Sequence, residues 1–407
     1  MSKKSPQLRF EGFTDDWEER KLSSISERVT RKNKNNESTL PLTISAQDGL
    51  IDQNDFFNKQ VASRDVTGYF LVKNGEFAYN KSYSNGYPWG AIKRLDKYDM
   101  GVLSTLYIVF RPTEINSQFL VSYYDTTRWY REVSKNAAEG ARNHGLLNIA
   151  PTDFFNTLLV VPKIVDEQEK IGSFFKQMDN TIALHQRKLD LLKEQKKGYL
   201  QKMFPKNGAK VPELRFAGFA DDWEERKLKE LGDIQTGNTP PTSDSDNYSL
   251  DGVLWVTPTD IKSLVISNTA KKLSQVGVTK ARIAKAGSIL VTSIASIGKN
   301  TLLRMDAGFN QQINSLTPTS ENDSYFLLTQ SEKWSEKMKQ TAASATMQIV
   351  NKTDFSNIST YVPVHKEEQE KIGSFFKQLD DTIALHQRKL DLLKEQKKGF
   401  LQTMFAK

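Results

Sequence analysis

One long amphipathic segment occurs twice in this chain of 407 residues, and the duplication restricts the fold more than any other feature. The segment IGSFFKQMDNTIALHQRKLDLLKEQKKG begins at Ile171, and a nearly identical copy begins at Ile372. Residues 167–204 and 368–405 agree at 34 of 38 positions. Two copies so far apart do not fit a solenoid, which has a shorter period and at least three units.

A second, shorter repeat accompanies the first. Residues 6–22 (PQLRFEGFTDDWEERKL) match residues 212–228 (PELRFAGFADDWEERKL) at 14 of 17 positions. We call these four repeated segments the frame. Residues 23–166 and 229–367, which we call the first and second inserts, are much less alike. The chain therefore reads as one duplicated frame that holds two different inserts.

The long repeat has the pattern of a coiled coil, because its apolar residues recur every 3.5 positions. At 38 residues each copy would be roughly 57 Å long, the length of about 17 base pairs of duplex. His185 and His386 fall on the apolar stripe and are interpreted as polar register markers. The predicted seam consists of Ile171, Phe175, Met178, Ile182, Leu189 and Leu192, and in the second copy of Ile372, Phe376, Leu379, Ile383, Leu390 and Leu393.

The two stripes need a partner, and each copy can supply it to the other. An antiparallel pair within one chain would place the repeats about an approximate two-fold axis. Pairing between two copies of the chain through the same seam stays open as the alternative. Pro205 cannot continue a helix and ends the first copy.

Both inserts mix strand and helix signals, so the predicted fold class is α+β. Short β-prone runs such as EFAYN at 76–80 and GSILVTSI at 287–294 alternate with turn residues. We predict two α+β domains separated by two long antiparallel coiled-coil helices, with a pseudo-two-fold internal repeat. The predicted segments are an N-terminal scaffold segment 1–22, a first domain 23–166, a central helix 167–204, a linker with the repeated scaffold segment 205–228, a second domain 229–367 and a C-terminal helix 368–407.

Composition excludes several classes of protein. With no cysteine the chain has neither disulfides nor thiolate metal sites, and no apolar run is long enough to cross a bilayer. These features predict a cytoplasmic protein without contact to the membrane. The net charge is +8, yet residues 23–160 carry 16 basic against 14 acidic side chains and residues 229–361 carry 13 against 12. A nucleic-acid surface would therefore depend on local clustering of charge.

The sequence offers no convincing catalytic or metal site. Residues 293–300 (SIASIGKN) resemble the end of a phosphate-binding loop but lack its first glycine and its final Ser or Thr. The four histidines have no metal-ligand spacing. No Asp-Pro-Pro-Tyr or Asn-Pro-Pro-Tyr stretch of an amino-methyltransferase is present. We therefore predict no catalytic residues, no metal and no cofactor bound to this chain.

The ordered combination of these motifs resembles the DNA specificity subunit of type I restriction-modification systems, over essentially the whole chain. The resemblance rests on the RFxGFxDDWEERKL segments, the EQEKIGSFFKQ(M/L)D helices and the dissimilar inserts. The second insert resembles a common target-recognition domain and the first another branch of such domains. The motifs are TGNTPP at 236–241, WV at 255–256, SIGK at 296–299 and NQ at 310–311, and in the first insert FAYN at 77–80 and STLY at 104–107.

The resemblance implies a function without catalysis of its own. Each target-recognition domain would read one half of a bipartite, asymmetric site in double-stranded DNA, and the paired helices would hold the halves at a fixed separation. Two modification (methyltransferase) subunits, which bind S-adenosylmethionine and methylate adenine, are expected as partners. Restriction subunits that hydrolyse ATP with Mg²⁺ are expected to join them. A bivalent adaptor that binds two different proteins would also combine a duplicated frame with divergent inserts, and it stays open as the alternative.

Base edges are read by Arg, Lys, Asn, Gln, Ser or Thr side chains on loops that reach a groove. Several segments of both inserts have this composition between turn signals. The candidates in the first insert are Lys81, Ser82, Tyr83, Ser84, Asn85, Arg128, Arg131, Arg142, Asn143 and His144. Those in the second are Thr236, Gly237, Asn238, Thr239, Ser293, Ser296, Lys299, Asn310, Gln311 and Gln312.

Overall fold

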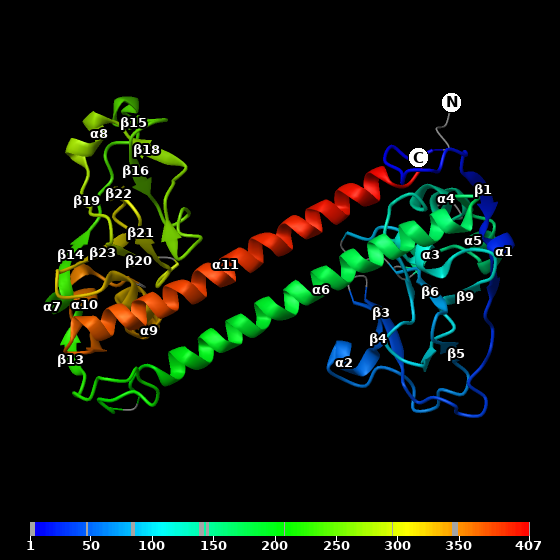
Figure 1. The fold of residues 1–407 in the computed structure, drawn as a ribbon, viewed down its shortest axis with the longest axis horizontal. Helices are drawn as coiled ribbons and strands as arrows, with labels where there is room; N and C mark the ends of the chain where they lie inside the picture. Colours follow the sequence, from blue (N-terminus) through cyan, green and yellow to red (C-terminus); the bar gives the residue numbers. More distant parts are fainter. Residues whose placement is uncertain are drawn as a thin grey trace. The chain divides into compact units, whose positions relative to one another are not determined.

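The computed structural model describes residues 5–45, 48–82, 86–137, 142–143, 146–206, 208–294, 296–343 and 349–406 (Figure 1). The chain divides into two compact units. The first comprises Met1–Gln186 with Arg388–Lys407, and the second comprises Arg187–Gln387. Each unit therefore contains one insert and a part of both long helices. No helix among the described residues is both long and apolar enough to span a membrane.

The first unit is built on a four-stranded antiparallel sheet in the order β2-β9-β6-β7, with the two-stranded sheets β3-β4, β5-β8, β10-β11 and β1-β12. Its strands are β1 (Glu18–Lys21), β2 (Ser26–Arg28), β3 (Leu42–Ser45), β4 (Gly49–Asp52), β5 (Phe70–Lys73), β6 (Phe77–Asn80), β7 (Ala91–Arg94), β8 (Met100–Leu103), β9 (Ile108–Pro112), β10 (Arg142–Asn143), β11 (Leu146–Leu147) and β12 (Leu158–Val161). Its helices are α1 (Leu22–Ile25), α2 (Gln53–Phe57), α3 (Ser117–Tyr124), α4 (Tyr130–Asn136), α5 (Pro151–Phe155) and the first part of α6 (Val165–Lys202).

The second unit has two five-stranded sheets, in the orders β14-β23-β20-β21-β17 and β15-β18-β16-β22-β19, and the pair β13-β24. Its strands are β13 (Glu224–Lys227), β14 (Gly232–Thr236), β15 (Tyr248–Ser249), β16 (Val253–Val256), β17 (Val265–Ile266), β18 (Lys271–Leu273), β19 (Ile283–Ala284), β20 (Ile289–Thr292), β21 (Asn300–Leu303), β22 (Ala307–Phe309), β23 (Ile313–Pro318) and β24 (Ser359–Val362). Its helices are α7 (Leu228–Leu231), η1 (Ser245–Asn247), α8 (Gln275–Lys280), α9 (Ser324–Ala343), α10 (Lys352–Ser356) and the first part of α11 (Lys366–Thr403).

In the first unit the start of α6 packs against the end of α11. The rings of Phe174 and Phe400 lie 5.1 Å apart between centroids, and Lys397 Nζ lies 2.7 Å from Asp179 Oδ1. Residue numbers rise along α6 as they fall along α11, so the two helices are antiparallel here.

The second unit repeats this contact with the roles of the helices exchanged. The rings of Tyr199 and Phe375 lie 5.0 Å apart, and Lys196 Nζ lies 2.7 Å from Asp380 Oδ1. These four residues occupy the repeat positions of Phe400, Phe174, Lys397 and Asp179. The prediction of an antiparallel helix pair within one chain is therefore confirmed, and the same contacts recur in each unit.

Both long helices begin and end slightly earlier than the repeat suggests. The helix α6 covers Val165–Lys202 rather than 167–204, and α11 covers Lys366–Thr403 rather than 368–407. The residues after each helix leave the helical path but stay buried, since Phe204 and Phe405 insert into the cores of their units. Every predicted seam residue is buried or half-buried.

Equivalent glutamine side chains of the two long helices bind the inserts in the same way. The amide N–H of Asn116, at the N-terminus of α3, donates to Gln168 Oε1 over 2.8 Å, and that of Asp323, before α9, donates to Gln369 Oε1 over 3.1 Å. At this crossing α6 has Gly172, where an added Cβ would lie 2.7 Å from the backbone nitrogen of Phe119. A glycine is therefore required where the insert helix approaches the long helix.

The fold class predicted from the sequence, α+β with two long helices, is confirmed. The runs EFAYN and GSILVTSI form β6 and β20, as their β-prone composition predicts. The division into six sequence segments stays a prediction, because the compact units cut through the middle of both long helices.

Candidate nucleic-acid interface

The candidate residues of the second insert lie on loops that leave the same end of one sheet. The strand β14 ends at Thr236, which is opposite Asn314 near the start of β23. The neighbouring strand β20 ends at Thr292, which is opposite Ile313. The loops after β14 and β20 and the loop before β23 therefore meet at one end of the sheet, although the sequence separates them by about 20 to 75 residues.

Direct hydrogen bonds join these three loops. The Oγ of Ser293 donates to the carbonyl of Gln312 over 3.0 Å, and the hydroxyl of Thr239 bonds to Gln311 Oε1. The N–H of Gly237 donates to the carbonyl of Ile313 over 3.0 Å. A side chain at Gly237 would overlap the carbonyl oxygens behind it, so only glycine fits this position.

Some of these candidates have structural partners, whereas others are accessible. Asn238 uses both ends of its amide, since Nδ2 donates to the carbonyl of Lys280 over 2.7 Å and Oδ1 accepts from the N–H of Arg282 over 2.6 Å. Ser293 is buried, and Thr236, Asn310 and Gln312 are half-buried. The candidates with exposed side chains are Thr239, Ser296, Lys299 and Gln311.

A pocket of about 380 Å³ opens beside these loops. Three of the candidates line it, and sequence reasoning missed its other polar and aromatic residues. The ammonium of Lys271 lies 5.8 Å from the ring centroid of Tyr248, and Thr257 Oγ1 donates to Asp260 Oδ2 over 2.6 Å. The lining residues are Thr239, Thr242, Tyr248, Trp255, Thr257, Thr259, Asp260, Ala270, Lys271, Asn310 and Gln311. Hydroxyl, amide and ammonium groups of this kind suit base edges and phosphates.

In the first insert, two of the predicted segments lie side by side. The N–H of Leu147 in β11 donates to the carbonyl of Lys81 over 3.1 Å, which brings the loop after β6 next to the β10-β11 hairpin. Lys81 and Ser82 are half-buried, and burial lowers the pKa of Lys81. Arg142 and Asn143 form β10, but their side chains are not described. Tyr83, Ser84, Asn85 and His144 lie outside the described residues.

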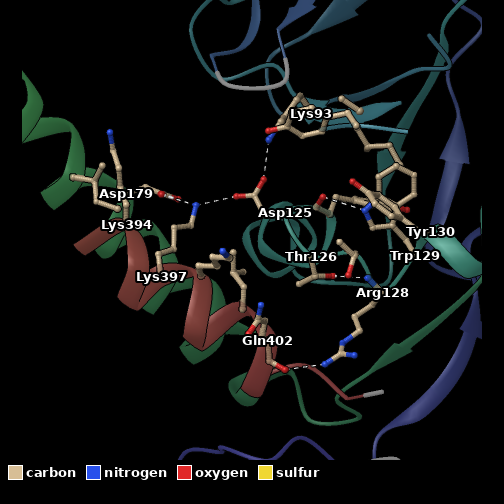
Figure 2. A pocket seen from close by; sticks show the side chains of 18 of the residues that line it. Lys93, Asp125, Thr126, Arg128, Trp129, Tyr130, Asp179, Lys394, Lys397 and Gln402 are labelled. Atoms are coloured by element: carbon tan, nitrogen blue, oxygen red, sulfur yellow. Dashed lines mark hydrogen bonds and ion pairs between the residues drawn. The ribbon is translucent and has the colours of Figure 1, made fainter. Parts of the chain in front are cut away.

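The two other candidates of the first insert lie elsewhere. Arg131 is exposed on α4. The guanidinium of Arg128 donates to the carbonyls of Gln402, over 2.8 Å, and Phe405, over 3.3 Å (Figure 2). The last carbonyls of a helix lack intrahelical donors, and a cation is favoured there by the helix dipole. Arg128 therefore holds the end of α11 against the first insert.

A buried ion pair, which sequence reasoning missed, recurs in both units. Arg9 Nε and Nη2 donate to the two carboxylate oxygens of Glu167 over 2.7 and 2.8 Å. Arg215 and Glu368 repeat this arrangement with the same distances. The hydrogen bond to Glu167 raises the pKa of Arg9, and that to Glu368 raises the pKa of Arg215. Each pair joins the short frame segment to the first turn of a long helix.

A further carboxylate links the first insert to both helices. Lys397 Nζ lies 3.0 Å from Asp125 Oδ2 and 2.7 Å from Asp179, and Lys93 Nζ lies 2.8 Å from Asp125 Oδ1 (Figure 2). Burial alone would raise the pKa of Asp125, but Lys93 and Lys397 lower it below its ordinary value. The insert thus bonds to the Lys397–Asp179 pair of the frame.

The second unit attaches its insert to the corresponding frame pair through a different group. The hydroxyl of Tyr325 on α9 donates to Asp380 Oδ2 over 3.0 Å, and Asp380 also pairs with Lys196. Burial, and then the charge of Asp380, raise the pKa of Tyr325. The frame pair is the same in both units, whereas the residue that reaches it differs with the insert.

Comparisons with known proteins agree with this organisation. Residues 220–395 match the family model described as the type I restriction modification DNA specificity domain. The chain is 26% identical over 181 residues to the type I restriction enzyme MjaIX specificity subunit of Methanocaldococcus jannaschii, and 29% identical over 170 residues to the HindI specificity subunit of Haemophilus influenzae. These alignments cover 43% and 40% of this chain, and the chain spans only 41% and 37% of the length of these two relatives.

A solved structure extends the likeness to the whole fold. The crystal structure of the type I restriction-modification system S subunit from M. genitalium matches with a TM-score of 0.67 and covers 99% of both chains. Its sequence identity is 14%, so this likeness concerns the fold alone.

Proposed function

We propose that this chain is a specificity subunit of a type I restriction-modification system and that it selects the DNA sites at which such a complex acts. Each insert reads one half of a bipartite, asymmetric sequence, and the long helices set the spacer between the halves. The subunit directs adenine methylation or DNA cleavage that other subunits perform. We expect no catalysis by this chain itself.

One observation carries the proposal: two ion pairs of the frame recur in both units, while the inserts differ. The Arg9–Glu167 and Arg215–Glu368 pairs and the Lys397–Asp179 and Lys196–Asp380 pairs are equivalent in the two units. A repeated frame suits two identical partners, and divergent inserts suit two different half-sites.

The loops of the second insert support a role in reading sequence. Thr239, Ser296, Lys299 and Gln311 are exposed on loops that leave one end of a sheet, where they can reach base edges. These side chains, together with Tyr248 and Lys271 of the adjacent pocket, are the contacts we propose for the second half-site.

The partners follow from the same proposal. We propose two modification subunits docked on the duplicated frame, with restriction subunits added to that assembly, all acting on double-stranded DNA in the cytoplasm. S-adenosylmethionine, ATP and Mg²⁺ would be held by these partners rather than by this chain.

Methylation mapping tests the proposal directly. Methylated adenines would be located genome-wide in cells that carry the system, first with this chain and then with residues 229–361 replaced by another target-recognition domain. We expect a bipartite motif in which the replacement changes one half and leaves the other unchanged. Changes in both halves, or the absence of a methylated motif when all subunits are present, would contradict it and favour the protein-binding adaptor.

A further inference from the structure

The first unit has a large cleft, and the one predicted base reader in its wall, Arg128, is bonded to the end of α11. It measures about 970 Å³ and lies between the first insert and the two long helices (Figure 2). The end of the loop before β7, the turn between α3 and α4, the middle of α6 and the last turns of α11 all contribute to its walls.

The cleft has an excess of positive charge on one side. Five basic side chains line it, against three carboxylates, Asp48, Asp125 and Asp179. Lys93 and Lys397 pair with Asp125 and Asp179, and Arg128 is bonded to backbone carbonyls. The positive charge that has no such partner therefore lies on the two remaining lysines of α11.

Those two lysines, Lys394 and Lys398, are both exposed, and neither forms an ion pair within the described residues. They are four residues apart, so they share one face of the helix. Lys397 is bonded to Asp125 and Asp179, and the carbonyl of Gln402 is bonded to Arg128. The helix end that carries the free ammonium groups is thus held in place relative to the first insert.

The cleft also adjoins a loop that we expect to read bases. Tyr87 and Gly90 line it, and they belong to the same β6-β7 connection as Lys81 and Ser82. A DNA strand whose bases reach that connection would carry its backbone along the neighbouring wall. Ammonium groups hold phosphates as point charges, and such contacts position a duplex without specifying its sequence.

We propose that this cleft holds backbone phosphates of the DNA, with Lys394 and Lys398 as their ligands. The frame helix then contributes to DNA binding itself, in addition to carrying the inserts. This inference rests on the proposed function, since it assumes that the first insert reads DNA. The carboxylate of Asp48, which also lines the cleft, would repel phosphates and so favour a position of the backbone close to the lysines of α11.

The test uses the complex with its modification subunits and a duplex that contains the mapped site. Binding constants would be measured by fluorescence anisotropy over a series of salt concentrations. Each phosphate contact contributes about 0.9 to the slope of log K against log salt. We therefore expect K394Q and K398Q each to reduce that slope by about 0.9 and to weaken binding to matched and mismatched duplexes alike.

A control variant separates this effect from a general loss of charge. Lys389 is exposed on the same helix but does not line the cleft, so K389Q should leave the slope nearly unchanged. An unchanged slope in both K394Q and K398Q would overturn the inference, as would an altered half-site. Failure of K394Q to assemble with modification subunits would also overturn it and point to a protein contact. If the wild-type complex itself bound DNA without sequence preference, the proposed function would fail first.

Discussion

Replacement of Glu167 by Gln should destabilise the first unit severely. The carboxylate is only 1% exposed and accepts two hydrogen bonds from Arg9, which is 14% exposed, so the pair is almost removed from water. It also accepts from Trp17 Nε1 over 3.3 Å. Loss of one charge from a buried pair costs about 3 to 5 kcal/mol, because the other charge stays buried without compensation. We expect about 3 kcal/mol for E167Q, since Gln keeps one acceptor oxygen.

The second unit supplies a matched comparison. In E368Q the guanidinium of Arg215 retains the carbonyl of Asp221 as an acceptor, at 2.8 Å. Trp223 Nε1 has no hydrogen-bond partner among the described residues, so none would be lost. One hydrogen bond is worth about 1 kcal/mol, so E368Q should cost about that much less than E167Q.

Denaturant unfolding followed by hydrogen exchange resolved to peptides measures each unit separately, which is necessary because the two units need not unfold together. Glu169 is exposed on the same helix, and E169Q should change the free energy of unfolding by less than about 0.5 kcal/mol. The double variant R9M/E167M should recover much of the loss, because it leaves no unpaired charge. A cost below about 1 kcal/mol for E167Q, or a double variant as unstable as E167Q, would refute the reasoning.

Three further predictions concern a carboxylate, a glycine and the long helices. D125N should destabilise the first unit at neutral pH. Because the pKa of Asp125 lies below its ordinary value of 3.8, the difference in unfolding free energy between D125N and wild type should be complete above about pH 4 and shrink as the pH falls. Equal differences in denaturation curves at pH 7 and pH 3 would contradict this. G237A should destabilise the second unit by about 1 to 3 kcal/mol in thermal melts, because a Cβ would overlap backbone carbonyls. As a control, the added Cβ of G198A in α6 meets no described atom within contact distance, so G198A should be neutral or stabilising. Equal melting temperatures of the two variants would contradict the prediction. One heptad inserted into each of α6 and α11 preserves the seam and adds about 10 Å, roughly three base pairs, while turning the half-sites by about 100°. We expect weaker binding of the original site and, in methylation maps, unchanged half-sites with a longer spacer; an unaltered spacer at full efficiency would exclude the helices as its determinant.

The repeat predicted the long helices, their seam and their antiparallel pairing, because a 3.5-residue period acts over many turns and leaves few alternatives. The strands β6 and β20 were likewise visible as β-prone runs. Sequence reasoning missed Arg9 and Glu167, which are buried together although 158 residues apart. Their exact repetition as Arg215 and Glu368 was the signal that could have identified them.

The candidate interface was predicted less completely. Composition selected Thr239 and Gln311, which the fold brings into contact, but it also selected Arg128, whose guanidinium is bonded to the end of α11. A long-range contact of this kind has no local signature. Tyr248 and Lys271 were missed because they are distant in sequence from the predicted loops. Only the pairing of β15 with β18 brings them beside the pocket.

The division of the chain into units has a consequence for its biosynthesis. The second unit is one continuous stretch, Arg187–Gln387, whereas the first needs Arg388–Lys407 in addition to Met1–Gln186. Met404 and Phe405 are buried in the core of the first unit, where the ring of Phe405 lies 6.2 Å from that of Trp17. During translation, residues 1–186 must therefore wait for residues 388–407, which are made only after the whole second unit. Until then the first unit exposes an apolar gap to chaperones and proteases, while the half made later can already close its own core.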